Sequence, residues 1–122
     1  MTITVRAAAK INLHLAVGAP REDGFHPLDT VYQAIDLYDD LSLSAADEDS
    51  LAVDGPPYVD LDGIPTDASN IAMRALAEVA CGGGHAVRIS KQIPVAGGMA
   101  GGSADGAAAL LAHDRLHGLD QP

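Results

Sequence analysis

A glycine-rich stretch from Pro94 to Asp105, PVAGGMAGGSAD, is the segment with the clearest capacity for chemistry. Glycines let the backbone approach an anion without a side chain in the way, and the helix expected from Ser103 would direct free N–H groups at that anion. The stretch is not a Walker A loop, because no Gly-Lys-Ser/Thr follows, and not a Rossmann fingerprint, because Met99 stands where a glycine is needed. It predicts a phosphate-binding turn, with a plain strand-to-helix connector as the alternative.

The two lysines of the sequence, Lys10 and Lys91, form the second candidate group. Lys10 and Asn12 lie two residues apart in an expected strand, so both side chains project from one face, opposite Ile11, and can meet one ligand. Lys91 stands three residues before Pro94, where an expected strand leads into the glycine-rich stretch. The alternatives are an exposed strand lysine for Lys10 and a solvated strand-end lysine for Lys91.

The charge of the chain restricts its partners. Its 17 acidic and 7 basic side chains give a net charge of -10, which repels nucleic acid and anionic membranes. The single cysteine, Cys81, cannot form an internal disulfide, and no apolar run approaches the roughly 18 residues that span a bilayer. We therefore expect a cytoplasmic protein without a nucleic-acid or membrane partner. Six acidic residues are expected to form a solvated face without chemistry: Asp36, Asp39, Asp40, Asp47, Glu48 and Asp49.

Alternating apolar residues predict the strands that position these groups within a single domain with an aliphatic core. A loop rich in Gly, Pro and charge is expected over 18–27, and Pro94 should end the last strand. The expected extended segments are two adjacent strands within 2–17 and single segments at 30–37, 41–43, 51–53 and 85–91.

Two helices are predicted from apolar residues at helical spacing. The first should be capped by Asp67 and end at 82–84, and the second should run from Ser103 to a terminating Gly118. The apolar positions that define them are Ile71, Ala75 and Val79 in the first helix and Ala107, Leu110 and Leu111 in the second.

Four segments, in matching order and spacing, resemble the GHMP kinases and, within them, the diphosphocytidyl-methylerythritol kinases. They are AAAKINLHLAVG, REDGFHPLDTVYQAIDL, Asn70 at the first helix, and PVAGGMAGGSAD. The last is similar to the family's Pro-x-x-x-Gly-Leu-Gly-x-x-Ser-Ser-Ala, with Met99 in place of Leu and Ala100 in place of Gly. The resemblance covers most of the chain. It implies that residues 1–122 form a GHMP kinase amino-terminal domain, a two-layer α+β fold like the second domain of ribosomal protein S5.

The resemblance implies transfer of the ATP γ-phosphate to the 2-hydroxyl of 4-diphosphocytidyl-2-C-methyl-D-erythritol, in the non-mevalonate route to isoprenoids, with ATP and Mg²⁺ as cofactors. Lys10 would stabilise the negative charge that develops during transfer, and Asn12 would lie beside it at the substrate. Phe25 would stack on the cytosine and His26 would hydrogen-bond the base edge. Phe25 replaces the family's tyrosine, so stacking is kept and any hydroxyl contact is lost. An ordinary loop histidine is the alternative for His26.

The family places the nucleotide against the glycine-rich stretch and its flanks. Ser103 would offer its hydroxyl to Mg²⁺ or a phosphate, or cap the helix, and Asn70 could equally be a helix cap. Asp105 is assigned to nucleotide or metal contact, because a carboxylate close to a triphosphate is repelled unless a metal ion or a ribose hydroxyl intervenes. The implied cofactor-binding residues are Asn70, Lys91, Pro94, Ala96, Gly97, Gly98, Met99, Ala100, Gly101, Gly102, Ser103 and Asp105.

The family's catalytic aspartate, in a Gly-x-Asp-Val-Pro-type segment, has no match in this sequence. We therefore expect a truncated amino-terminal domain without its carboxy-terminal domain, with little or no kinase activity alone. Apolar surface left uncovered would favour self-association. The alternatives are a GHMP kinase for homoserine or mevalonate, a non-catalytic nucleotide-binding remnant, and an S5-like nucleic-acid module.

Overall fold

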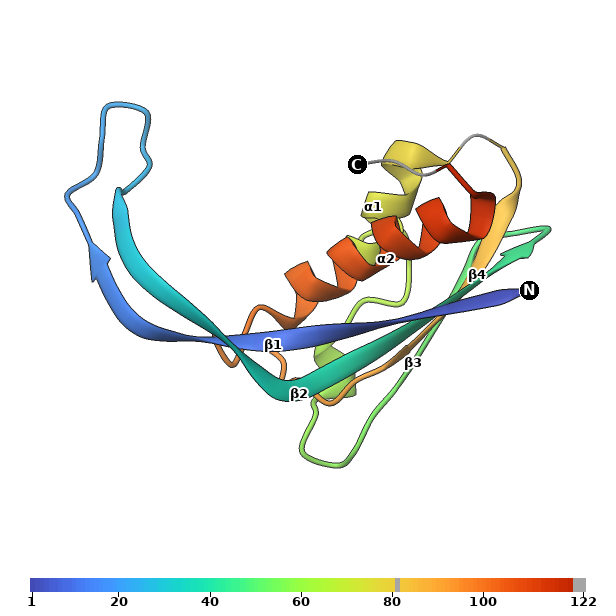
Figure 1. Cartoon of the computed structure of the whole chain (residues 1–122), viewed down its shortest axis with the longest axis horizontal. Coiled ribbons are helices and arrows are strands. Elements are labelled where there is room, and N and C mark those ends of the chain that lie inside the picture. The colour runs from blue at the N-terminus through green and yellow to red at the C-terminus, as the bar shows by residue number, and fades with distance from the viewer. Residues whose placement is uncertain (81, 120–122) are drawn as a thin grey trace.

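The computed structural model describes residues 1–80 and 82–119, and the expectation for Cys81 lies outside them. Two helices pack on one face of a four-stranded sheet of order β1-β2-β4-β3 (Figure 1). Strands β3 and β4 are parallel, and the other neighbours are antiparallel. The two-layer α+β expectation is confirmed. The elements in chain order are β1 (Thr2–Val17), β2 (Leu28–Ala46), β3 (Ser50–Asp54), the 3₁₀ turn η1 (Leu61–Gly63), α1 (Ile71–Val79), β4 (Gly84–Ser90) and α2 (Gly101–His117).

The first two strands form one long hairpin that extends well past the helices (Figure 1). The expected pair of strands within 2–17 is wrong, because β1 runs unbroken and absorbs the change of register in two irregularities, between Ala8 and Lys10 and between Asn12 and His14. Such bulges shift which face the side chains occupy without ending the pairing. The expected segments at 30–37 and 41–43 are likewise parts of the single strand β2.

The core lies between the helices and the middle of the sheet. Alternate residues of the two central strands face it, Leu41 and Leu43 from β2 and Val87 and Ile89 from β4, and all four are buried. The helices add small and aliphatic side chains, so the core is aliphatic, as expected. The buried apolar residues of the helices are Ala72, Met73, Leu76, Ala108, Ala109 and Ala112.

The buried faces of the helices differ from the sequence expectation. In α1 the residues at the two ends of the expected stripe, Ile71 and Val79, are exposed, and in α2 Leu110 and Leu111 are exposed. Close approach of the two helices explains which face of α2 is buried. A Cβ on Gly106 would lie 2.8 Å from Cγ2 of Ile71, so only a face of glycine and alanine fits there.

The helix starts also differ from the expectation. Asn70, and not Asp67, is the N-cap of α1, and its side chain accepts a hydrogen bond from the Ala72 N–H at 2.9 Å. Asp67 instead accepts from the Ser69 N–H in the preceding turn. Helix α2 begins two residues before Ser103 and ends, as expected, at a left-handed Gly118. None of the described helices has the length and apolar character that a membrane span requires.

Candidate functional site

The cofactor-binding residues that were expected from the sequence meet at one pocket of about 430 Å³. Its wall is made by the loop between β4 and α2, by the start of α1 and by the segment after η1. The structure therefore brings together the glycine-rich stretch, Asn70, Lys91, Ser103 and Asp105. The lining residues are Gly63, Ile64, Pro65, Ser69, Asn70, Ile71, Lys91, Asp105 and all of Pro94–Ser103.

The loop presents backbone to this pocket. Gly98 has a φ of 76°, and the alanines Ala96 and Ala100 are also left-handed, with φ of 58° and 59°. An L-residue other than glycine adopts this conformation at a cost of about 1 kcal/mol, so the fold must hold both alanines in place. Ala100 is the N-cap of α2 and offers no side-chain cap. The first N–H groups of α2 therefore have no intrahelical acceptor and lie at the pocket wall, where the helix dipole favours an anion.

Gly101 allows α2 to start this close to the end of the sheet. A Cβ at this position would lie 3.0 Å from Cγ2 of Ile93 and 3.2 Å from the Lys91 ammonium. A close approach of this kind requires glycine, although its φ is ordinary. The glycine therefore sets the position of the first turn of α2.

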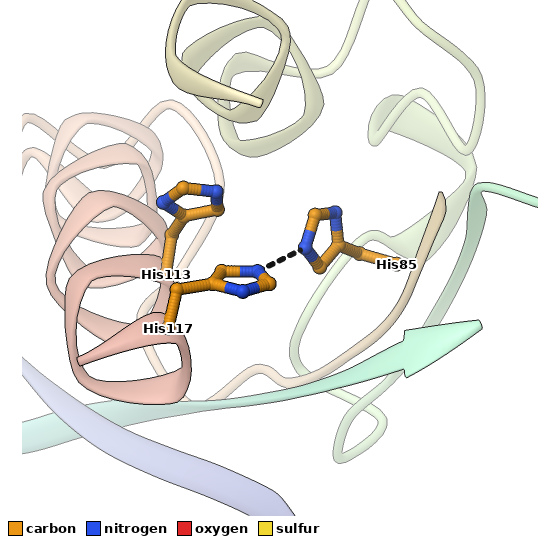
Figure 2. A group of neighbouring side chains, drawn as sticks. All are labelled: His85, His113 and His117. Atoms are coloured by element: carbon orange, nitrogen blue, oxygen red, sulfur yellow. Dashed lines mark hydrogen bonds between the residues drawn. The ribbon is translucent and has the colours of Figure 1, made fainter. Parts of the chain in front are cut away.

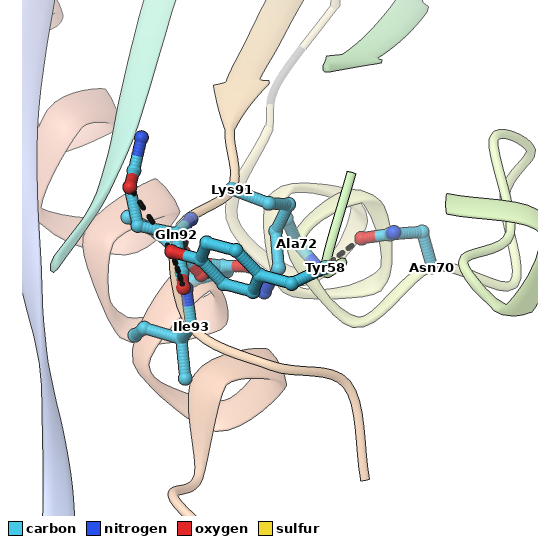
Figure 3. A network of polar contacts seen from close by, with 8 residues as sticks. Tyr58, Asn70, Ala72, Lys91, Gln92 and Ile93 are labelled. Atoms are coloured by element: carbon cyan, nitrogen blue, oxygen red, sulfur yellow. Dashed lines mark hydrogen bonds and ion pairs between the residues drawn. The ribbon is translucent and has the colours of Figure 1, made fainter. Parts of the chain in front are cut away.

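Lys91 is the centre of a buried ionic network. Its Nζ lies 2.6 Å from Oδ2 of Asp39 and 2.9 Å from Oδ2 of Asp105. The other oxygen of Asp39 accepts the backbone N–H groups of Gln92 at 2.8 Å and Ile93 at 3.0 Å. Figure 3 shows Lys91, Gln92 and Ile93 in succession where the chain leaves β4, with Asn70 and Ala72 at the start of α1 nearby. The network joins β2, the exit of β4 and the second turn of α2.

This network corrects two expectations. Asp39 is not part of a solvated face, because its exposed fraction is 0%. Lys91 is not a solvated strand-end lysine, because 4% of it is exposed and both its carboxylate partners are buried. A buried charge requires partners of opposite sign and hydrogen bonds, and the two aspartates supply them.

The three charges of the network do not titrate alike. Burial and the hydrogen bond with Asp39 raise the pKa of Asp105 to about 7. Burial also acts to raise the pKa of Asp39, but its hydrogen bonds to Asp105, Lys91 and the backbone outweigh burial and lower that pKa. Burial opposes the charge of Lys91, yet the two carboxylates outweigh it and raise the lysine's pKa. Near neutral pH, Lys91 and Asp39 are charged, and Asp105 is the group that gains or loses a proton.

One oxygen of Asp105 stands apart. Among the buried side-chain oxygen and nitrogen atoms of the described residues, Oδ1 of Asp105 is the one that has no hydrogen-bond partner. Asp105 also lines the pocket. A buried polar atom without a partner is costly, which is a reason to look for a ligand that supplies one.

Lys10 and Asn12 share one face of β1, as expected. Nζ of Lys10 donates to Oδ1 of Asn12 at 2.7 Å, and Nδ2 of Asn12 donates to the Thr30 hydroxyl at 2.8 Å. The Lys10 ammonium also lies 5.1 Å from the ring centroid of Tyr32. The Lys10 backbone N–H donates to the carbonyl of Met99 at 3.1 Å. The lysine is thereby tied to the glycine-rich loop, although its side chain is outside the set that lines the pocket.

Phe25 and His26 lie at the far tip of the β1–β2 hairpin, away from both helices (Figure 1). The Asp23 carboxylate accepts the Phe25 N–H at 3.0 Å, and Nδ1 of His26 lies 2.9 Å from the Gly18 carbonyl. The Phe25 ring is 68% exposed. Neither residue lines the pocket, so the structure separates the expected base-recognition residues from the expected nucleotide residues.

Comparison with known proteins assigns this architecture. The family described as GHMP kinases N terminal domain matches residues 69–122. The 4-diphosphocytidyl-2-C-methyl-D-erythritol kinase of Nocardioides sp. (strain ATCC BAA-499 / JS614) is 58% identical over 120 residues, which are 95% of this chain and 40% of that protein. That of Streptomyces coelicolor (strain ATCC BAA-471 / A3(2) / M145) is 50% identical, over 97% of this chain and 40% of the relative. The chain belongs to the GHMP kinases.

Solved structures agree with this membership of the GHMP kinases. A crystal structure of 4-(cytidine 5'-diphospho)-2C-methyl-D-erythritol kinase superposes with a TM-score of 0.73 at 32% identity, over 98% of this chain and 42% of that one. A putative homoserine kinase from Listeria monocytogenes superposes with a TM-score of 0.63 at 21% identity, over 100% of this chain and 39% of that one. This second likeness supports a shared fold and nothing more. The chain spans about 40% of the length of the curated relatives it matches.

Beside this pocket, Asp39 is the network residue that was not predicted from the sequence. The sequence contained a signal for its burial. Asp39 is separated by two and by four residues from Leu41 and Leu43 of the same strand, and both leucines are buried. Alternation places residues i, i+2 and i+4 on one face. An acid in the register of the core residues therefore indicates a buried partner, here Lys91.

Proposed function

We propose that this chain is the nucleotide-binding amino-terminal domain of an ATP-dependent kinase, with the loop from Pro94 to Ser103 around the phosphates. The observation that carries this proposal is the uncapped start of α2, which lies at the pocket directly after a loop with two left-handed alanines, Ala96 and Ala100. Backbone N–H groups bind phosphate without needing positive side chains. Such a site suits a protein whose net charge is -10.

The reaction proposed is transfer of the ATP γ-phosphate to the 2-hydroxyl of 4-diphosphocytidyl-2-C-methyl-D-erythritol, a step of the non-mevalonate isoprenoid pathway. The names of the relatives at 58% and 50% identity support this substrate. Lys10, held beside Met99 by a backbone hydrogen bond, would stabilise the charge that develops on the transferred group. Asn12 orients its ammonium.

Phe25 and His26 would then hold the cytosine at the hairpin tip. The exposed ring of Phe25 is free to stack on a base, which requires only its face. The substrate would lie along the face of β1 that carries Lys10 and Asn12, between the hairpin tip and the glycine-rich loop. Recognition of the base and transfer to the hydroxyl would therefore use opposite ends of one small molecule.

Mg²⁺ fits the acidic wall of the pocket. Oδ1 of Asp105 is a buried acceptor without a partner, and Ser103 lies in the same turn of α2 and lines the pocket. Oxygen ligands of this kind suit Mg²⁺. When bound, the ion would neutralise charge on the phosphates. Asp105 and Ser103 would hold it, directly or through water.

We further propose that the rest of the active site, including a carboxy-terminal GHMP domain and the catalytic base, lies outside residues 1–122. The chain spans about 40% of its relatives, and no Gly-x-Asp-Val-Pro-type segment is present in it. By itself it should bind nucleotide and turn over slowly or not at all, because phosphoryl transfer depends on positioning by the whole cleft. Since the donor is ATP, we expect the reaction in the cytoplasm.

The uncovered hairpin supports a second expectation, that the isolated chain self-associates. Apolar side chains are exposed on both of its strands, and exposed apolar surface is a common interaction site. They are Leu13, Leu15, Val17, Leu28, Val31 and Tyr32. Sedimentation velocity should show dimers or larger species that disappear when Leu15 and Val31 are both changed to Ser. A monomer at all concentrations would contradict this expectation.

The test of the proposed function is ADP release by the 122-residue chain with MgATP and the diphosphocytidyl substrate, beside Lys10→Ala, together with equilibrium binding of ATP. Saturable binding with little turnover is the expected result. Substrate-dependent turnover that Lys10→Ala abolishes would confirm the kinase but contradict the incompleteness of the site. Absence of ATP binding would contradict the proposal. Competition by cytidine nucleotides, but not by homoserine or mevalonate, would identify the substrate class.

A further inference from the structure

Three histidines gather at the end of α2 that is remote from the phosphate loop. His113 and His117 lie one turn apart on α2, and His85 faces them from the start of β4 (Figure 2). The sequence contains five histidines, so more than half of them converge here. With a rise of 1.5 Å per residue, His117 lies about 21 Å along the helix from Ser103, so this cluster is separate from the proposed nucleotide site.

The ring nitrogens of the cluster are close enough to share one ligand. One nitrogen from each of the three residues can be chosen so that all lie within 4.8 Å of one another. Nε2 of His85 and Nε2 of His117 are 2.9 Å apart, and the ring centroids of His113 and His117 are 4.5 Å apart. Carboxyl groups act on two of the rings, Asp49 on His85 and Asp114 on His113, but neither belongs to the group whose ligand atoms converge. The cluster is therefore an all-imidazole group.

The surroundings of His85 and His113 favour their neutral form. Burial, followed by the nearby His117, lowers the pKa of both His85 and His113 below the ordinary histidine value. Neutral imidazole is the form that binds transition metals, so the lowered pKa of His85 and of His113 favours their ligand form. A hydrogen bond between Nε2 of His85 and Nε2 of His117 already brings two of these nitrogens together, and a bound ion would replace the proton that they share (Figure 2).

We propose that His85, His113 and His117 bind one divalent transition metal ion, with Zn²⁺ as the best match and water as a fourth ligand. Two histidines four residues apart on a helix are a common half of such sites. At a Zn–N distance of about 2.1 Å, tetrahedral geometry needs about 3.4 Å between ligand nitrogens. The present separations, 2.9 Å and at most 4.8 Å, bracket that value, so small side-chain rotations complete the site.

The positions of the three residues suit such a site. The backbone N–H of His85 donates to Oδ1 of Asp49 at 2.9 Å, which fixes the start of the strand that carries this ligand. His85 and His113 are buried, whereas His117 is exposed and gives the ion a way in. Imidazole-only ligands disfavour Mg²⁺ and Ca²⁺, which prefer oxygen. The ion of the histidine cluster would therefore be distinct from the Mg²⁺ of the phosphate site.

The test is calorimetric titration of Zn²⁺ alone into the metal-free 122-residue chain, purified without a polyhistidine tag, followed by thermal unfolding with and without the ion. We expect one ion per chain, an unfolding temperature raised by Zn²⁺, and no displacement by excess Mg²⁺. His117→Gln should weaken binding roughly a hundredfold or more, whereas His14→Gln, an exposed histidine on β1, should leave it unchanged. Equal binding by both variants, or no saturable binding, would overturn the proposal.

Co²⁺ provides a readout that does not depend on the variants folding well. A four-coordinate cobalt site with nitrogen ligands gives intense visible bands, and a thiolate ligand adds a charge-transfer band at shorter wavelength. The wild-type chain should show the first and not the second. A thiolate band would indicate binding through Cys81, and a weak six-coordinate spectrum would indicate loose surface binding. Either result would overturn the three-histidine assignment, even if His117→Gln does not fold.

Discussion

Asp39, Lys91 and Asp105 show how single residues link the fold to the site. One lysine satisfies two buried carboxylates that come from a strand and a helix far apart in the sequence. Because the same lysine lines the pocket, its ion pair with Asp105 joins the pocket wall to the second turn of α2. Changes to any of the three should therefore affect both stability and binding.

Asp105→Asn should change how stability depends on pH. The folded-state pKa of Asp105 is raised, from 3.8 to about 7, so its contribution is fully present below pH 3.8 and is lost as pH rises through 7. Relative to the Asn variant, the wild type should lose about 1 kcal/mol or more between about pH 4 and about pH 8. Urea unfolding at several pH values measures this difference. Asp40→Asn, which changes an exposed residue next to the network, is the control. If the stability of Asp105→Asn depended on pH in the same way as that of the wild type, the raised pKa of Asp105 would be refuted.

Asp39→Ala should be far more destabilising than Asp40→Ala. The Asp39 change removes a fully buried acceptor of three hydrogen bonds and leaves the Gln92 and Ile93 N–H groups without their partner. Breaking a buried pair costs about 3 kcal/mol or more, whereas the exposed pair of Asp40 with Arg6 is worth about 1 kcal/mol or less. Chemical denaturation compares the two variants directly. Similar losses would mean that Asp39 is not the buried anchor described.

At the scale of elements, both α-helices, the strand segments and the terminating Gly118 could be predicted from the sequence, but η1, the buried faces of the helices and their N-caps could not. Periodicity alone could not choose between the leucine and the alanine face of α2, because the choice depends on how closely Ile71 approaches Gly106. Asp67 and Asn70 are both good caps, and the observed cap depends on where α1 begins. The place of the glycine-rich loop between β4 and α2 could be predicted because its composition is a local signal, while the burial of Asp39 depends on its long-range partner Lys91.

Gly101→Ala should weaken nucleotide binding by about tenfold and destabilise the chain by about 1 to 2 kcal/mol. The added methyl group would press on Ile93 and on the Lys91 ammonium and displace the first turn of α2. Gly102→Ala is a matched control for the loss of stability, since its Cβ would meet only the flexible end of Ile71, at 3.3 Å. Equilibrium binding of ATP and thermal unfolding measure the two effects. Equal stability of the two variants would contradict the close-approach argument.

At the scale of the whole molecule, a strongly acidic chain is proposed to bind a polyanion through neutral N–H groups. The net charge of -10 repels free ATP at long range, while binding at the helix start is short-range. The rate of ATP association without Mg²⁺ should therefore rise by about twofold or more as KCl increases from about 0.05 to about 0.3 M. Stopped-flow kinetics can test this. A falling rate would indicate attraction by a basic site that the structure does not contain among the described residues.

The strand order has a consequence for how the chain acquires its structure. Strand β4 lies between β2 and β3, yet it follows both in the sequence. During synthesis, the β1–β2 hairpin can form early, but one edge of β2 stays open until β4 has left the ribosome. Non-local pairing of this kind is slow and leaves strand edges exposed to aggregation. The ion pair between Asp39 and Lys91, 52 residues apart, can close only after β4 is in place, so it marks completion of the sheet.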